Sequence, residues 1–484
     1  MSKIKYIHKL LETKQLSCTE LTYKYLQSIE TENKKLNAYV NVTHEVALKT
    51  AKEVDERIAR KEKLSPLEGI PMSLKDNIST KNIETTCCSN ILKDYVPIYD
   101  ATVWELLKNQ NAVLLGKTNM DEFAMGSSCE TSCFGGAKNP HDTSRVAGGS
   151  SGGAASSVAG NIAVFGLGSD TGGSVRQPAS FCDLVGLKPT YGTVSRYGLI
   201  AYASSLDQIG PIASCVEDAA IIYDSISLYD SKDATSRESK STADKLDKSI
   251  KGMKIGIAEE FFDGIREDIK QCIDEALKVY EDLGCEVVHL SFPQIKHALP
   301  VYYIIACAEA SSNLGRYDGI RYGYKASNYS DINDMICKTR SHGFGKEVQR
   351  RILLGTYVLS AGYFDAYYKK AQSLRGSIIK AFNEAFTLCD VMLTPTVPTT
   401  AFKLGFTQHE PIETYLTDIC TVPVNIAGLP AVSIPCGFDD KGLSIGMQLI
   451  GNTFDDAVIL NAAYQYEQQT KDKIYKHVES GVML

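Results

Sequence analysis

The stretch GSDTGGSVRQPA, residues 168–179, places Ser174 directly after two glycines and before a run that has the character of a helix start. The apolar segment 163–167 before it predicts a buried strand, so the order is strand, glycine turn and helix. Gly172 and Gly173 have no side chains that would block a bound acyl group. These features are typical of a nucleophilic serine, with consecutive N–H groups of the turn forming an oxyanion hole.

The region around this turn, residues 132–193, is dominated by glycine, serine and alanine and contains few charges. Small side chains allow the backbone to approach other backbone or a ligand closely. The alternative is a low-complexity linker, but the embedded strand and the turns on either side of it argue against a flexible tether.

A serine nucleophile needs a base, and the residues alone leave its identity open. The histidine nearest in sequence, His141, lies in NPHD, a turn pattern that explains it without chemistry. Lysine can replace histidine where burial lowers its pKa, and Lys75 follows an apolar run, residues 67–74, that predicts a buried strand. On the residues alone, a surface lysine that caps a strand end is the favoured interpretation of Lys75. A second glycine-rich loop carries Ser150, which could relay a proton between Lys75 and Ser174.

The rest of the chain predicts an α/β protein. At 484 residues it suits one large domain with insertions, or two domains. It opens with helices over about residues 1–62, marked by a capping box at Ser17–Glu20. A charged, serine-rich segment at 229–251 predicts a surface excursion or subdomain boundary, and a β-α-β unit follows it at 253–292.

Several function classes find no support in the sequence. The net charge of −7 gives no general attraction for polyanions, so direct nucleic-acid binding by this chain alone is not expected. No GxxxxGK[ST] or GxGxxG motif, no CxxC pair and no zinc-ligand spacing occur. The chain shows no signal peptide and no long apolar run, which predicts a cytoplasmic protein with no membrane partner and reduced, mostly buried cysteines.

Long segments of the chain resemble the amidase signature family. The strongest are GGSSGGAASSVA at 148–159 and the segment from Gly168 to Leu199, and the resemblance extends to 67–78, 101–128, 138–153 and 422–438. Within the family the chain is most similar to the A subunits of tRNA-dependent amidotransferases, through residues 119–142, 318–326, 343–372 and 415–430. The resemblance implies a single domain over 1–484 with the amidase signature fold, a large mixed central β-sheet covered by helices on both faces.

The resemblance also implies site residues. The family uses a Ser-cisSer-Lys triad, which carries over as Ser174 (nucleophile), Ser150 (relay serine after a cis peptide bond) and Lys75 (base). The backbone N–H groups of Thr171, Gly172, Gly173 and Ser174 would hold the oxyanion. Glutamine would be bound by Arg351 at its α-carboxylate and by Asp418 at its α-ammonium, with Tyr302, or Tyr303 beside it, as a third contact.

The function implied by the resemblance is hydrolysis of glutamine to supply ammonia to a heterotrimer. A partner B subunit would bind misacylated tRNA and use ATP and Mg²⁺, a small C subunit would brace the assembly, and this chain would need no cofactor. The products would be Gln-tRNA(Gln), Asn-tRNA(Asn) or both. Two alternatives stay open at this point: a stand-alone amidase for small amides, and an inactive scaffold protein.

Overall fold

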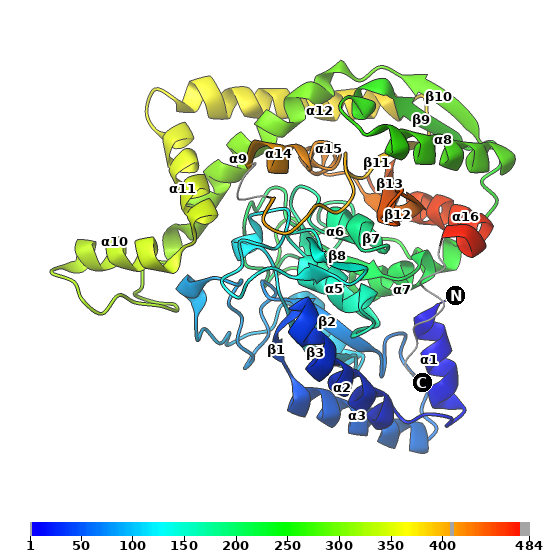
Figure 1. The fold of residues 1–484 in the computed structure, drawn as a ribbon, viewed down its shortest axis with the longest axis horizontal. Coiled ribbons are helices and arrows are strands. Elements are labelled where there is room, and N and C mark those ends of the chain that lie inside the picture. Colours follow the sequence, from blue (N-terminus) through cyan, green and yellow to red (C-terminus); the bar gives the residue numbers. More distant parts are fainter. Residues whose placement is uncertain (1, 407–410, 475–484) are drawn as a thin grey trace.

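The fold is organised by one mixed β-sheet of eleven strands, in the order β1-β3-β2-β6-β8-β7-β12-β13-β11-β9-β10 (Figure 1). The computed structural model describes residues 2–406 and 411–474. The strands of the sheet are β1 (Tyr39–Val42), β2 (Pro71–Lys75), β3 (Val113–Thr118), β6 (Phe165–Asp170), β7 (Val185–Lys188), β8 (Gln208–Ala213), β9 (Lys254–Ala258), β10 (Glu286–Leu290), β11 (Val391–Pro395), β12 (Ala431–Phe438) and β13 (Ser444–Gly451). A separate two-stranded ribbon pairs β4 (Lys138–Asn139) with β5 (Asp142–Val146).

Two blocks of parallel strands flank an antiparallel middle. β2 lies between β3 and β6 and runs parallel to both. At the other end, β9 runs parallel to β10 and β11, which confirms the β-α-β unit expected at 253–292. The burial pattern of β2, β3 and β6 is continuous rather than alternating, as expected for strands covered on both faces.

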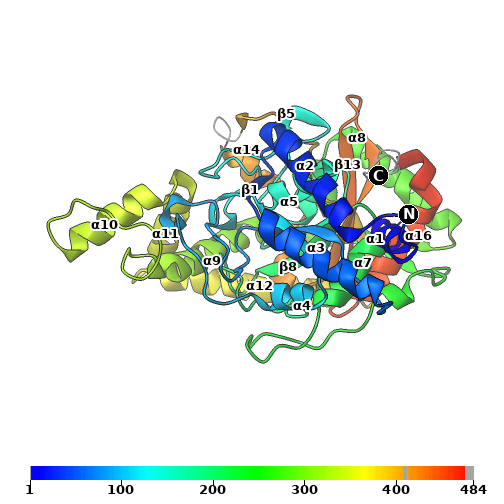
Figure 2. The same ribbon diagram turned by 90° about the horizontal axis from the view of Figure 1, so that it is seen from below.

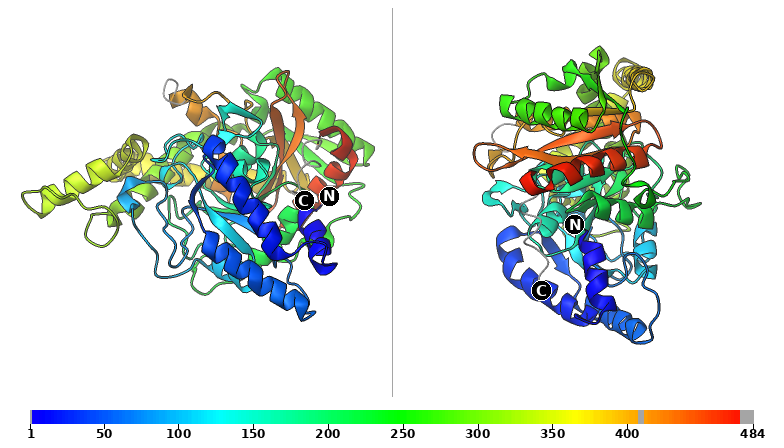
Figure 3. Two further views of the ribbon diagram at one scale, coloured as in Figure 1. Left: turned by 60° about the horizontal axis from the view of Figure 1, so that its bottom comes forward. Right: turned by 90° about the vertical axis from the view of Figure 1, so that its right-hand side faces the viewer.

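Helices cover both faces of the sheet, as the views in Figure 3 show. The α-helices are α1 (Lys3–Glu12), α2 (Cys18–Leu36), α3 (His44–Ala59), α4 (Thr102–Asn109), α5 (Gly152–Ala159), α6 (Arg176–Phe181), α7 (Val216–Ile226), α8 (Glu267–Asp282), α9 (Ala298–Asn313), α10 (Ile332–Gly343), α11 (Lys346–Leu359), α12 (Lys370–Ala385), α14 (Pro411–Leu416), α15 (Val422–Ala427) and α16 (Asp456–Ile474). The predicted mixed α/β architecture is confirmed. α10 extends away from the sheet in two perpendicular views (Figures 1 and 2).

Shorter helical turns connect these elements. They are η1 (Asn90–Leu92), η2 (Glu122–Ala124), η3 (Ala243–Lys245), η4 (Glu259–Phe262), η5 (Pro293–His297), η6 (Leu314–Arg316) and the π-helical turn η7 (Phe364–Lys369). Within the segment 229–251, η3 is the one helical turn that the structure assigns. Asp230 ties the start of this segment to the body, because its carboxylate accepts hydrogen bonds from Thr102 and Ser195 at 2.6 Å each.

Two local predictions differ from the structure at their edges. The strand expected at 67–74 begins only at Pro71 and includes Lys75 as its last residue. Residues before it form a turn in which Gly69 has φ +73°, a conformation that glycine adopts without strain. The strand expected at 163–167 is displaced toward its carboxyl end and runs to Asp170, so the glycine turn follows an acidic residue directly. The capping box is confirmed, with both hydrogen bonds between Ser17 and Glu20 formed.

Two large hydrophobic clusters form the core, and the glycine turn lies where they meet. The first cluster packs the sheet against helices that include α2, α3, α8 and α16, and it contains Val175. The second joins α9, α12 and α15 and contains Tyr302. The ring of Tyr302 lies against Gly172, where an added Cβ atom would approach its Cζ atom to 2.7 Å. The glycine turn is therefore held between two packed units.

Candidate active site

The turn between β6 and α6 carries Ser174 and is built around Asp170. The Asp170 carboxylate accepts the backbone N–H of Gly173 at 2.8 Å and that of Val175 at 3.2 Å. Gly173 has φ +135°, a region that side-chain-bearing residues rarely adopt. The turn thus needs its second glycine. Ser174 is 8% exposed, at the edge of the buried interior.

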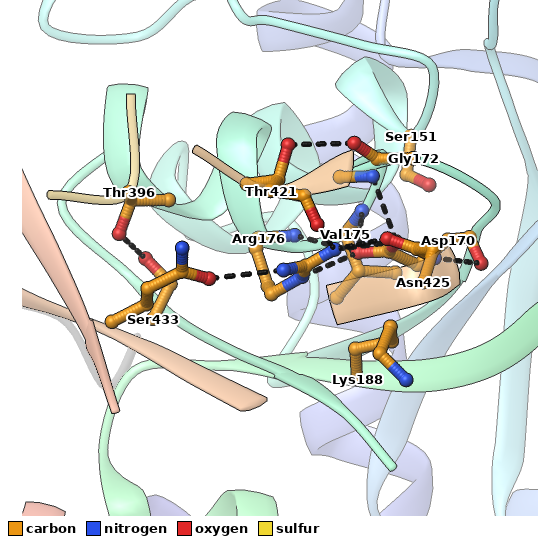
Figure 4. A network of polar contacts seen from close by, with 12 residues as sticks. Ser151, Asp170, Gly172, Val175, Arg176, Lys188, Thr396, Thr421, Asn425 and Ser433 are labelled. Carbon is orange, nitrogen blue, oxygen red and sulfur yellow. Dashed lines mark hydrogen bonds and ion pairs between the residues drawn. The ribbon is translucent and has the colours of Figure 1, made fainter. Parts of the chain in front are cut away.

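A buried ion pair holds this carboxylate in place (Figure 4). Arg176 contacts Asp170 through Nε and Nη2, both at 3.0 Å, and neither side chain reaches solvent. Burial alone would raise the pKa of Asp170, but the Arg176 guanidinium outweighs it and holds that pKa well below its usual range. Arg176 also donates to Asn425 at 2.6 Å and to Gln448 at 2.9 Å. The pair therefore anchors the Ser174 turn to segments far along the chain.

Lys75 lies at the end of β2, beside β6, and is fully buried. Its Nζ atom is 2.8 Å from Ser150 Oγ, 2.8 Å from Ser151 Oγ and 3.1 Å from the carbonyl oxygen of Ser169. Burial lowers the pKa of Lys75 to about 8, against the opposing effect of nearby Asp121. A lysine with this pKa is partly neutral near pH 8 and can accept a proton.

Ser150 occupies the loop before α5, and the Gly149–Ser150 peptide bond is cis. Gln177 clamps this loop to α6, since its side-chain oxygen accepts the Gly149 N–H at 2.8 Å. On the other side of the loop, the N–H of Ser151 donates to the carbonyl oxygen of Ser174 at 3.1 Å. The structure thus brings Lys75 and Ser150 into direct contact and places the Ser150 loop against the Ser174 turn.

The predicted oxyanion donors are backbone N–H groups of this same turn, and they differ in whether they already donate a hydrogen bond within the protein. The N–H of Gly173 already donates to Asp170, so an oxyanion would have to compete with that carboxylate. The side chain of Thr171 donates to Asp207 at 2.7 Å, and the carbonyl oxygen of Gly172 accepts from Thr421 Oγ1 at 2.6 Å. Of the four predicted donors, the Gly173 N–H is therefore the one already engaged by the Asp170 carboxylate.

Arg351 on α11 lines a cavity of about 620 Å³ together with Ser127, Glu347 and Tyr415. Its guanidinium contacts Glu347 at 2.9 Å through Nε and the Tyr202 hydroxyl at 2.6 Å through Nη1. The rings of Tyr202, Tyr303 and Tyr415 lie 5.3 to 5.8 Å from it. A guanidinium stacked among aromatic rings keeps its donor plane fixed, which suits recognition of a carboxylate. Tyr202 is also joined to the Ser174 turn, because the Asp207 carboxylate accepts from both the Tyr202 N–H and the Thr171 hydroxyl.

Asp418 lies beside the same cavity and is 9% exposed. The hydroxyl of Ser127, which lines the cavity, contacts both Asp418 carboxylate oxygens at 3.0 and 3.2 Å. Burial raises the pKa of Asp418 to about 7, and the Ser127 hydrogen bond opposes that rise. A buried carboxylate beside a cavity is suited to pair with a ligand cation.

The two adjacent tyrosines divide between the turn and the cavity. Tyr302 packs on Gly172, whereas the ring of Tyr303 lies 4.7 Å from that of Tyr415 and 5.3 Å from the Arg351 guanidinium. The buried hydroxyl of Tyr303 has no hydrogen-bond partner among the described residues. Tyr302 therefore packs against the Ser174 turn, and Tyr303 packs against two of the side chains that line the cavity.

Sequence reasoning missed the residues that support these groups. Asp170 and Arg176 are oppositely charged residues, six positions apart, in a block of small residues. Their charges in that block were the signal that could have pointed to a buried ion pair. No such signal marks Ser127, Gln177 and Tyr202, because their hydrogen-bond partners lie far away in the sequence. His141 is accounted for by the fold, since its ring nitrogen lies 3.1 Å from the carbonyl oxygen of Cys182.

Metal sites and membrane spans do not occur in the part of the chain that the structure describes. No group of three or more His, Cys, Asp or Glu side chains is placed to hold a metal ion there. Over the same residues, no helix is long and apolar enough to cross a membrane. All fourteen cysteines are free thiols and most of them are buried, as expected.

Comparison with known proteins identifies the family. The amidase family model matches residues 20–460. The A subunit of glutamyl-tRNA(Gln) amidotransferase from Thermoanaerobacter pseudethanolicus is 54% identical over 96% of each chain, and that from Thermosynechococcus vestitus is 51% identical over 97% of this chain and 98% of the other. The crystal structure of the corresponding protein from Thermotoga maritima matches with a TM-score of 0.77 at 42% identity, covering 94% of each chain. The peptide amidase from Stenotrophomonas maltophilia matches with a TM-score of 0.81 at 28% identity over 96% of each chain. The chain belongs to the amidase family, in the group of its glutamyl-tRNA(Gln) amidotransferase A-subunit relatives.

Proposed function

We propose that this chain is the glutamine-hydrolysing component of a tRNA-dependent amidotransferase, with Ser174, Ser150 and Lys75 as its catalytic triad. The observation that carries the proposal is the contact between Lys75 Nζ and Ser150 Oγ, 2.8 Å apart in a buried site next to the Ser174 turn. High identity to A subunits along almost the whole chain supports the choice of substrate.

The first half of the reaction forms an acyl-enzyme. Ser174 Oγ attacks the side-chain amide carbon of glutamine while its proton passes through Ser150 to neutral Lys75. N–H groups of the turn at Thr171, Gly172 and Ser174 stabilise the negative oxygen of the tetrahedral intermediate. The proton then returns through Ser150 to the leaving nitrogen, and ammonia departs from a glutamyl ester on Ser174.

The second half regenerates the enzyme. A water molecule gives its proton to Lys75 through Ser150 and attacks the ester carbon, and the same N–H groups stabilise the new intermediate. Collapse of that intermediate breaks the bond to Ser174 Oγ, which takes the proton back. Glutamate leaves, so each cycle consumes one glutamine and one water and yields glutamate and ammonia.

Arg351 and Asp418 would hold the two charged ends of the glutamine main chain. The guanidinium pairs with the α-carboxylate in a bidentate manner, and the Asp418 carboxylate pairs with the α-ammonium. Tyr302 and Tyr303 complete the wall between these charges and the turn, since one packs on Gly172 and the other on Arg351. Arg351 also contacts Glu347 at 2.9 Å, so the substrate carboxylate would share the guanidinium with that side chain. Among the described residues, Asp418 has no cationic partner at hydrogen-bond distance, and the α-ammonium would supply one.

The ammonia would pass to a partner. A B subunit that binds misacylated tRNA would use ATP and Mg²⁺ to activate the tRNA-linked carboxylate, and a small C subunit would brace the complex. The net charge of −7 on this chain fits a division of labour in which RNA contact is made mainly by the partner.

The test is ammonia release from glutamine by this chain, with and without candidate B and C subunits, beside Ser174→Ala. The expected result is activity that rises with the partners and disappears in the variant. Hydrolysis of simple amides through Ser174, with glutamine untouched in both settings, would instead make the chain a stand-alone amidase and remove the roles given to Arg351 and Asp418.

A further inference from the structure

Thr421 connects the nucleophile turn to the segment that carries Asp418. Its side chain is fully buried, and Oγ1 donates to the carbonyl oxygen of Gly172 at 2.6 Å (Figure 4). The same hydroxyl lies 3.2 Å from the carbonyl oxygen of Asp418. One side chain therefore touches both the turn at which an oxyanion would form and the backbone of the residue that would bind the α-ammonium.

The contact with Gly172 fixes one end of a rigid unit. The peptide bond joining Gly172 to Gly173 is planar, with its C=O and N–H pointing in opposite directions. Thr421 holds the C=O end, and Asp170 holds the N–H end at 2.8 Å. The orientation of this plane determines where the neighbouring N–H groups of the turn point. Thr421 thus takes part in aiming the oxyanion donors.

The other side of Thr421 belongs to the Asp418 turn. The backbone N–H groups of Thr421 and Val422 donate to the Asp418 carbonyl oxygen at 3.1 and 3.0 Å, at the entry to α15. Arg176 fastens the same segment from a second direction, since Nη2 donates to the Thr421 carbonyl oxygen at 3.1 Å. These contacts fix the position of Asp418 relative to the turn.

The approach between the two segments is close enough to require glycine. A Cβ atom added at Gly173 would lie 2.3 Å from Thr421 Oγ1 and 2.8 Å from its Cβ atom. Contacts under 3.0 Å force something to shift, and here the obstacle is a buried side chain. The second glycine of the turn therefore makes room for Thr421 as well as adopting a positive φ.

We propose that Thr421 is a positioning residue that couples glutamine recognition to catalysis. Thr421 holds the Ser174 turn at a fixed position relative to Asp418. Binding of the glutamine α-ammonium at Asp418 then places the side-chain amide at Ser174. This inference rests on the proposed function, because it concerns the same site and the same substrate.

The test compares two substrates in the complex with its partner subunits: glutamine, and the monoamide of glutaric acid, which lacks the α-ammonium. Thr421→Val removes the hydroxyl at almost constant volume. We expect it to lower kcat for glutamine by about 10- to 100-fold, less than the roughly 10²- to 10³-fold loss on removal of an oxyanion donor, because the donors themselves remain. We also expect the preference for glutamine over the monoamide, measured as a ratio of kcat/KM, to fall by about tenfold. Thr421→Ser keeps the hydroxyl and should restore both quantities to within about threefold of the wild type.

A matched control is available nearby. Thr396 is also fully buried, and its hydroxyl pairs with that of Ser433 at 2.9 Å, away from Gly172 (Figure 4). Thr396→Val makes the same chemical change and should leave the substrate ratio unchanged. A Thr421→Val enzyme whose ratio stays within twofold of the wild type, or whose ratio changes no more than that of Thr396→Val, overturns the proposal.

Two outcomes remain to be separated. If Thr421→Val does not fold, Thr421→Ala takes its place, with the same expected losses in kcat and in the substrate ratio. If only variants that keep a hydroxyl fold, Thr421 is required for folding and the proposal is wrong. Wild-type release of ammonia from glutamine, lost in Ser174→Ala, is measured first. Its absence overturns the proposed function and this inference together, whereas its presence with an unchanged ratio in Thr421→Val overturns this inference alone.

Discussion

The Nζ atom of Lys75 lies 2.8 Å from the Oγ atom of Ser150, and neither side chain reaches solvent. A buried amine is costly to keep charged, so burial lowers the pKa of Lys75 to about 8, and Asp121 only partly opposes this effect. The lysine is therefore close to the point at which it can exchange a proton with the hydroxyl beside it.

The first prediction concerns pH. A protonated Lys75 cannot accept a proton, so kcat/KM should fall about tenfold per pH unit below about pH 8 and level off above it. For glutamine a second loss is expected below about pH 7, where Asp418 becomes neutral and no longer binds the α-ammonium. For the glutaric acid monoamide, which has no α-ammonium, kcat/KM should show only the decrease caused by protonation of Lys75. Initial rates of ammonia release from pH 6 to 9 check this, and a flat profile between pH 6 and 8 would exclude Lys75 as the base.

The second prediction separates two serines at equal distance from one lysine. Ser150 and Ser151 each lie 2.8 Å from Lys75 Nζ, but only Ser150 is assigned to proton relay. Ser150→Ala should lower kcat by about 10²- to 10⁴-fold, the range for loss of a proton-transfer group. Ser151→Ala should cost less, because Ser151 contributes hydrogen bonds to the backbone of Ser169 rather than transferring the proton. Equal losses in the two variants would contradict the assignment.

The third prediction concerns Asp418. Asp418→Asn removes the charge and keeps the shape, so KM for glutamine should rise by about 10- to 100-fold, in line with loss of a buried ion pair to the substrate. The dependence of KM on pH near 7 should disappear with the titrating group. Turnover of the glutaric acid monoamide should change little, and a comparable loss on both substrates would show that Asp418 does not recognise the α-ammonium.

The family resemblance supplied the triad as a set, whereas the residues alone placed only Ser174 and Lys75 at particular points of the fold. Ser174 follows a strand and two glycines, and Lys75 ends an apolar strand, so the placement of each in the fold could be predicted from periodicity and turn composition. The residues alone favoured a surface lysine at position 75, and only the family resemblance pointed to a base. The structure decides this point of geometry, since β2 lies inside the parallel block between β3 and β6 and its end is covered.

The supporting contacts could not be predicted, because each joins residues that are distant in the sequence. Arg176 reaches Asn425 across 249 positions and Gln448 across 272. Thr421 reaches Gly172 across 249 positions. Local propensity carries no information on such pairs, and strand order in a mixed sheet is fixed by packing of the whole chain rather than by any one segment. The exact strand edges at β2 and β6 depend on the same packing.

The last prediction concerns the stability contributed by Asp170 and Arg176. Both side chains are fully buried, and Arg176 holds the pKa of Asp170 well below its usual range. Arg176→Met leaves a buried carboxylate without its partner and should lower the free energy of unfolding by about 3–5 kcal/mol. This contribution is fully present above the unfolded pKa of about 3.9 and is lost as pH falls through the lower folded pKa, so neutral pH is the right condition. Lys338→Met, which breaks an exposed pair with Asp334 at 2.8 Å, is the matched control and should change the free energy of unfolding far less, because water screens an exposed pair. Urea unfolding followed by circular dichroism gives both values. An Arg176→Met variant as stable as the control would show that the ion pair does not hold the nucleophile turn in place.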